Sequence, residues 1–98
     1  MNTSAERQLV IDPTLDVMTF PCEFPLKAFG KNTDDFEALI VTIVRRHVPD
    51  LDDGAVSSRT SGGDAYRAVT ATFMAQSREQ LDALYAELSG HEQVLMLL

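Results

Sequence analysis

The spacing of apolar residues along the chain alternates between the two-residue repeat of strands and the 3.6-residue repeat of helices. The pattern predicts strands at 24–29, 55–61, 65–75 and 94–98, and helices that begin near residues 33 and 77. The order strand, helix, strand, strand, helix, strand fills residues 20–98. It predicts one α+β domain, a ferredoxin-like βαββαβ sandwich with a four-stranded antiparallel sheet and two helices on one face.

The same repeats predict which side chains face the core. The apolar stripe of the first helix comprises Phe36, Leu39, Ile40, Ile43, Val44 and His47, and that of the second comprises Leu81, Leu84, Tyr85 and Leu88. In the first strand, Phe24, Leu26 and Ala28 are expected on the core face. In the third strand, Val69, Ala71, Phe73 and Ala75 are expected there, with Tyr66, Thr70 and Thr72 on the opposite, open face.

Capping and turn residues predict the element boundaries. We expect Gly30 to end the first strand, with Lys31 and Asn32 forming the turn that follows. Asp34 and Glu37 fit a capping box at the first helix, as Ser77 and Gln80 do at the second. Gly62-Gly63-Asp64 predicts a tight hairpin between the second and third strands.

The first 19 residues are expected to form a tail outside the domain. Asp12-Pro13 could begin a short helix at 13–18, because Asp caps helices and Pro suits their first position. The tail has no basic head followed by an apolar stretch, so we predict no secretory signal. The longest apolar run, residues 94–98, is far shorter than a membrane span. The single cysteine, Cys22, fits a cytoplasmic location.

The formal net charge is −7, from 8 basic and 15 acidic side chains. Such a charge repels the phosphate backbone, so it disfavours nucleic acid and anionic membranes as partners. It suits a basic protein partner.

No catalytic or metal-binding constellation is found, and we expect no cofactor. His47 has no second histidine near it in sequence, and a packed histidine at a helix end is the simpler interpretation. The Asp50-Asp52-Asp53 loop does not have the closing glutamate of a calcium loop. Cys22 has no fixed base close in sequence. We therefore predict that the protein is not an enzyme.

Several features together resemble the YbeD-like family of small bacterial proteins over roughly residues 15–98. These features are Phe20-Pro21 before the first strand, Gly30 after it, Arg46-His47-Val48-Pro49, Tyr66, and Leu84-Tyr85-Ala86-Glu87-Leu88. The resemblance implies a ferredoxin-like fold similar to amino-acid-sensing ACT domains, and a regulatory link to lipoate metabolism. In ACT domains the loop after the first strand contacts the effector. This implies Gly30, Lys31 and Asn32 as ligand-binding candidates, although a glycine needed only for the turn is the simpler interpretation.

Apolar residues outside the predicted core indicate an interface. The last strand has no polar alternation, so Leu95 and Leu97 could contact a protein partner, including a second copy of the chain, or pack against the N-terminal segment. Phe29 and Tyr66 could project from the open sheet face. The leading hypothesis is a regulatory or adaptor protein that acts through protein contacts, ahead of an ACT-like metabolite sensor and of RNA binding through the open face.

Overall fold

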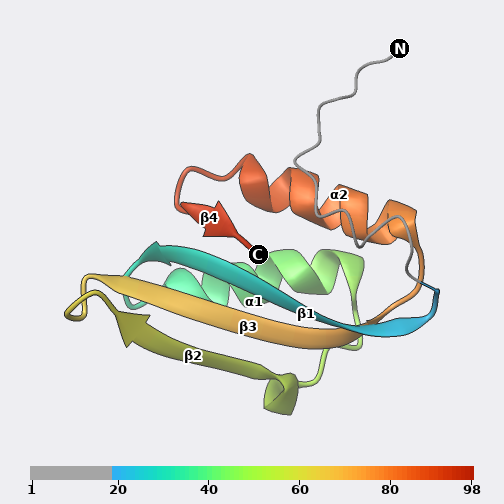
Figure 1. Ribbon diagram of the computed structural model, residues 1–98, viewed down its shortest axis with the longest axis horizontal. Helices are drawn as coiled ribbons and strands as arrows, with labels where there is room; N and C mark the ends of the chain where they lie inside the picture. The colour runs from blue at the N-terminus through green and yellow to red at the C-terminus, as the bar shows by residue number, and fades with distance from the viewer. Residues whose placement is uncertain (1–18) are drawn as a thin grey trace.

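The computed structural model describes residues 19–98, in which four strands and two helices follow the predicted order (Figure 1). The elements are β1 (Cys22–Lys31), α1 (Phe36–His47), the 3-10 helix η3 (Asp53–Ala55), β2 (Val56–Ser61), β3 (Tyr66–Ala75), α2 (Arg78–Ser89) and β4 (Met96–Leu97). The expected tail and its short helix at 13–18 lie outside the described residues, apart from Thr19. No helix among residues 19–98 is long and apolar enough to cross a membrane.

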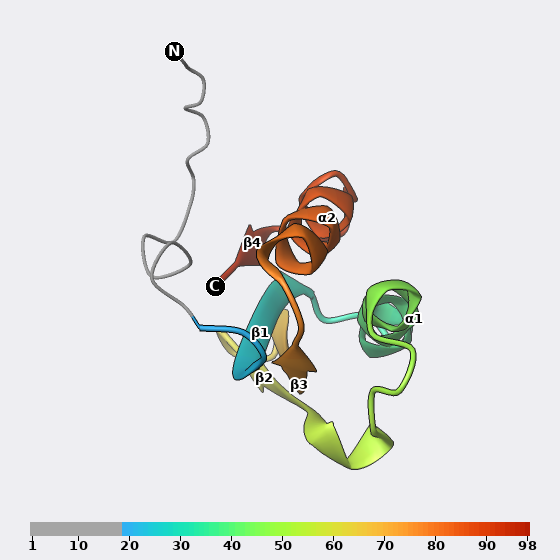
Figure 2. The ribbon, with the colours of Figure 1, turned by 90° about the vertical axis from the view of Figure 1, so that its right-hand side faces the viewer.

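The strands form one antiparallel sheet in the order β2-β3-β1-β4. The two central strands, β1 and β3, pair along ten residues, from Cys22 opposite Ala75 to Lys31 opposite Tyr66. Both helices cover the same face of the sheet (Figure 2). This arrangement confirms the predicted ferredoxin-like α+β fold.

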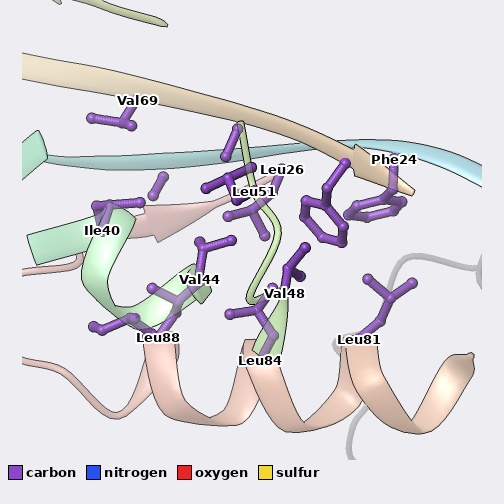
Figure 3. Close-up of a cluster of buried hydrophobic side chains, with 14 of the residues drawn as sticks. Phe24, Leu26, Ile40, Val44, Val48, Leu51, Val69, Leu81, Leu84 and Leu88 are labelled. Carbon is purple, nitrogen blue, oxygen red and sulfur yellow. The ribbon is translucent and has the colours of Figure 1, made fainter. Parts of the chain in front are cut away.

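One hydrophobic core fills the space between the helices and the sheet (Figure 3). The helices contribute the predicted stripes, of which Phe36, Ile40, Ile43, Val44, Leu81, Leu84 and Leu88 are fully or almost fully buried. The sheet contributes Phe24, Leu26, Ala28, Val69, Ala71, Phe73 and Ala75. Because side chains of a strand alternate between its two faces, the odd-numbered residues of β1 and the even-numbered residues of β3 point away from the helices.

Pro25 is accommodated by the position of β4. Lys27 exchanges both backbone hydrogen bonds with Leu98, so the odd-numbered residues of β1 direct their backbone groups toward β4. Among residues 19–98 no strand pairs with Pro25 on that side, so its missing N–H breaks no ladder.

The hairpin and the start of α2 follow the predictions. Gly62, Gly63 and Asp64 all have positive φ, as a tight turn requires. The Ser77 hydroxyl accepts a hydrogen bond from the Gln80 N–H at 3.1 Å. The reciprocal bond of the capping box is displaced by one residue, since the Gln80 side chain accepts from the N–H of Gln76.

Three boundary predictions were wrong. β1 does not end at Gly30 but includes Lys31, which pairs with Tyr66. The first helix begins at Phe36 rather than Thr33 or Asp34, and Asp35 is the N-cap residue without a side-chain capping bond. The Asp34–Glu37 capping box therefore does not form. The last strand is two residues long instead of five, although Leu95 and Leu98 extend its backbone pairing with β1.

Gly30 is required by packing and not by a turn. It lies inside β1 on the core face and is buried. A Cβ atom at this position would overlap the Phe36 ring and lie 2.6 Å from the Gln93 carbonyl oxygen. The start of α1 and the loop before β4 thus both approach the strand where it has no side chain.

We expect Gly30→Ala to lower the free energy of unfolding by about 1–3 kcal/mol, because the added methyl group overpacks the contact with Phe36 and Gln93. Urea unfolding of the two proteins measures the difference. Gly54→Ala is the control, since a Cβ there meets nothing closer than 3.8 Å. Equal midpoints for Gly30→Ala and the wild type would show that the contact tolerates a side chain.

Candidate functional site

The face of the sheet opposite the helices, called the open face below, carries exposed apolar side chains. Tyr66, Met96 and Leu98 are 46%, 55% and 60% exposed, and Met74 is also exposed. Phe29 lies among them and is half-buried. Large apolar side chains that share one uncovered face are typical of a surface that contacts another molecule.

The strand register places Phe29 at the centre of this group. Phe29 is opposite Ala68 on β3 and opposite Met96 on β4. Leu98 lies two residues beyond Met96 on the same face, because it pairs with Lys27. Tyr66 is the diagonal neighbour of Phe29 across β1 and β3, at a distance typical of about 7–8 Å between Cα atoms. Phe29, Tyr66, Ala68, Met96 and Leu98 are called the Phe29 cluster.

Three basic residues surround the Phe29 cluster. Lys27 and Lys31 precede and follow Phe29 by two residues on β1, so both share its face. Arg59 on β2 is opposite Ala68, in the same transverse row as Phe29 and Met96. All three are exposed, and none has a side-chain hydrogen bond or ion pair within residues 19–98.

The other basic side chains of the described part are held by neighbours. Arg45 pairs with Asp53, Arg46 pairs with Glu87, and Arg78 lies 3.7 Å from the Asp82 carboxylate. Arg67, on the helix side of β3, donates to Asn32 and Ser58. The basic groups that stay unpartnered within residues 19–98 are thus those of the open face, on a chain whose formal charge is −7.

Within residues 19–98, the acidic residues lie mainly in the helices and in the loops beside them. Among the strands, Glu23 is the carboxylate that shares the open face, near the end of β1 that is far from Lys31. The sheet side is therefore locally basic, and the helix side is acidic.

The loop candidates Gly30, Lys31 and Asn32 do not come together as one site. Gly30 lies on the core face of β1, and the Lys31 side chain points to the open face. The Asn32 side chain donates to the Asp64 carbonyl at 2.9 Å and accepts from Arg67 at 3.0 Å. Asn32 thus joins the end of β1 to the hairpin between β2 and β3.

The residues predicted to form an interface also do not all lie on one surface. Phe29 and Tyr66 share the open face, and Leu95 is 54% exposed. Leu97 is half-buried and packs against the core. Met96 and Leu98, which the apolar pattern does not single out, contribute to the Phe29 cluster instead. Their face depends on the register of β4 against β1, which a run of five apolar residues does not reveal.

The residues considered for catalysis or metal binding make packing contacts and hydrogen bonds within the fold. Cys22 is half-buried against the core, and Asp52 accepts from the Gly54 N–H at the start of η3. His47 lies in the last turn of α1, where its Nε2 is 2.8 Å from the Glu87 carboxylate. No group of three potential metal ligands is found within residues 19–98.

Glu87 joins the two helices. It contacts both Arg46 and His47 of α1, while the Gln80 side chain donates to the His47 carbonyl at 2.9 Å. These contacts satisfy a carbonyl at the end of α1 and fix the position of α2 against it. The geometry explains His47 as a packed histidine at a helix end, as predicted.

Comparison with known proteins identifies the family of this chain. The model of the family described as "Protein of unknown function (DUF493)" matches residues 16–98. The chain belongs to this family. A UPF0250 protein of Chromobacterium violaceum is 44% identical over 87 residues, which cover 89% of this chain and 98% of the relative. This finding confirms the resemblance to the YbeD-like family, whose members are UPF0250 proteins.

Two further UPF0250 relatives illustrate the extent of the match. The protein of Nitrosomonas europaea is 42% identical over 82 residues, covering 84% of this chain and 94% of the relative. The protein of Ralstonia nicotianae is 38% identical over 96 residues, covering 98% of this chain and 99% of the relative. The open face and the Glu87 contacts lie within the DUF493 region.

We expect Glu87→Ala to lower the free energy of unfolding by about 1–2 kcal/mol, because both Arg46 and His47 lose their partner on α2. Thermal or urea unfolding measures the change. Glu92→Ala is the control, since Glu92 is exposed in the loop before β4, and its removal should change stability by less than about 0.5 kcal/mol. If Glu87→Ala and Glu92→Ala change the free energy of unfolding by the same amount, Glu87 does not join the helices.

Proposed function

We propose that this DUF493 protein is a non-enzymatic adaptor that binds another protein through the open face of its sheet. The observation that carries the proposal is the Phe29 cluster, in which Tyr66, Met96 and Leu98 expose about half or more of their surface on a face that neither helix covers. Burying such side chains against a partner is favourable by roughly 25 cal/mol per Å² of apolar surface.

The composition of the face also supports a protein as the partner. Met74 and Met96 have flexible, polarisable side chains that adapt to irregular apolar surfaces. The rigid centre of the cluster is Phe29, whose position is set by pairing with strands on both sides. A rigid aromatic centre surrounded by adaptable side chains resembles the usual composition of protein interfaces.

The surroundings of Gly30 support the metabolite-sensor hypothesis less than the open face supports the adaptor hypothesis. The Phe36 ring and the Gln93 carbonyl fill the space next to this glycine, and Asn32 is engaged by Asp64 and Arg67. A regulatory role and a link to lipoate metabolism, implied by the family resemblance, stay predictions.

The test compares two neighbouring residues of equal exposure. We expect Met96→Ser to weaken partner capture from the native cytoplasm by roughly five- to thirtyfold, the effect of losing 1–2 kcal/mol of interface energy. Leu95→Ser should leave capture unchanged, because Leu95 is as exposed as Met96 but is not part of the Phe29 cluster. Quantitative mass spectrometry of the captured proteins, followed by calorimetry with the purified partner, provides the readout.

Two outcomes would contradict the proposal. If Leu95→Ser abolished capture and Met96→Ser did not, the interface would lie away from the open face. If both variants retained the same proteins as the wild type, no partner would depend on this surface. Both side chains are exposed, so neither change should alter the melting temperature by more than a few degrees.

A further inference from the structure

The arrangement of charge around the Phe29 cluster specifies the chemistry of its partner. We propose that the open face binds a segment of another protein in which apolar side chains are flanked by carboxylates. This inference rests on the proposed function and adds the class of partner. It differs from the expectation that the total charge of −7 suits a basic partner, because the charges that adjoin the cluster have the opposite sign.

The basic groups are placed so that any occupant of the cluster must meet them. Lys27, Lys31 and Arg59 lie on three sides of the cluster, within about two strand spacings of Phe29, or roughly 10 Å. A segment that buries the cluster must therefore pass close to all three. Its own charged groups would meet ammonium and guanidinium groups at the rim of the contact.

These basic groups have no partner within the described chain. Arg45, Arg46 and Arg78 each have a carboxylate neighbour on the helix side, whereas the three groups around the cluster have none within residues 19–98. A carboxylate brought by another protein would thus form new ion pairs without breaking existing ones. Interfaces use such complementarity to select partners and to speed encounter.

Charge also disfavours two other occupants of the open face. A second copy of the chain placed on this face would bring three more basic groups against Lys27, Lys31 and Arg59, with Glu23 as the carboxylate on its strands. Like charges placed opposite one another at an interface are unfavourable. Nucleic acid would meet three basic groups but only one well-exposed aromatic ring in the cluster, that of Tyr66, next to aliphatic side chains that do not stack on bases.

The experiment titrates the isotope-labelled 98-residue chain with two synthetic 18-residue amphipathic peptides. One has a leucine face flanked by glutamates, and the other has the same leucine face flanked by lysines. We expect the glutamate peptide to shift the amide resonances of Phe29, Ala68 and Met96, and the lysine peptide to leave them unchanged. Raising the salt concentration should weaken the binding of the glutamate peptide.

Charge reversal provides the matched comparison. Lys27→Glu and Arg59→Glu combined should weaken binding of the glutamate peptide by about tenfold, since each exposed ion pair contributes a few-fold and repulsion replaces it. Arg78→Glu on the helix side is the control for either single reversal, because each such substitution lowers the net charge by two, whereas the double variant lowers it by four. An acidic residue in the first turn of α2 is also favourable for that helix.

Each other result would overturn the proposal. Equal shifts with both peptides, no shift with either, or an unchanged affinity after charge reversal would show that carboxylates are not recognised. Shifts with an oligouridylate probe instead would assign the face to nucleic acid. Concentration-dependent dimerisation through this face, or contacts from residues 1–18 to Phe29 before any peptide is added, would assign the face to the chain itself. Capture that depends on Met96 but not on Lys27 and Arg59 would retain the adaptor function while rejecting the acidic partner.

Discussion

The antiparallel pairing of β1 with β3 governs both faces of this molecule. Ten residue pairs in continuous register determine the face of every side chain on the two central strands. Phe24, Leu26 and Ala28 point to the helices because of this register, and Lys27, Phe29 and Lys31 point to the open face. A shift by one residue would exchange the two sets, burying two lysines and exposing the core.

Core packing and the open face are therefore two consequences of the same pairing. Gly30 lies on the core face, where its missing side chain admits the Phe36 ring and the Gln93 carbonyl. This close approach brings the loop after α2 back to β1, so that β4 can pair beside Phe29. The exposed position of Met96 thus follows indirectly from a glycine on the other face of the neighbouring strand.

The charges are distributed according to the same two faces. Basic groups on the helix side stabilise the packing of α1 and its following loop, as Arg46 does through Glu87 and Arg45 through Asp53. The basic groups on the open face make no such ion pairs within residues 19–98. A chain that is acidic as a whole can in this way present a basic surface around an apolar centre. Net charge alone does not describe the electrostatics that a partner meets at short range, where screening by salt is weak.

Local patterns in the chain are sufficient to predict the elements, the fold class and most of the core. Periodicity reports which side chains of a helix or strand share a face, and that information is local. Leu81, Leu84 and Leu88 could therefore be assigned to the core from their spacing alone. The start of α1 at Phe36, the role of Gly30 and the face of Met96 are set instead by tertiary contacts. These features depend on residues far apart in the chain, since the register of β4 against β1 is not encoded in either segment alone.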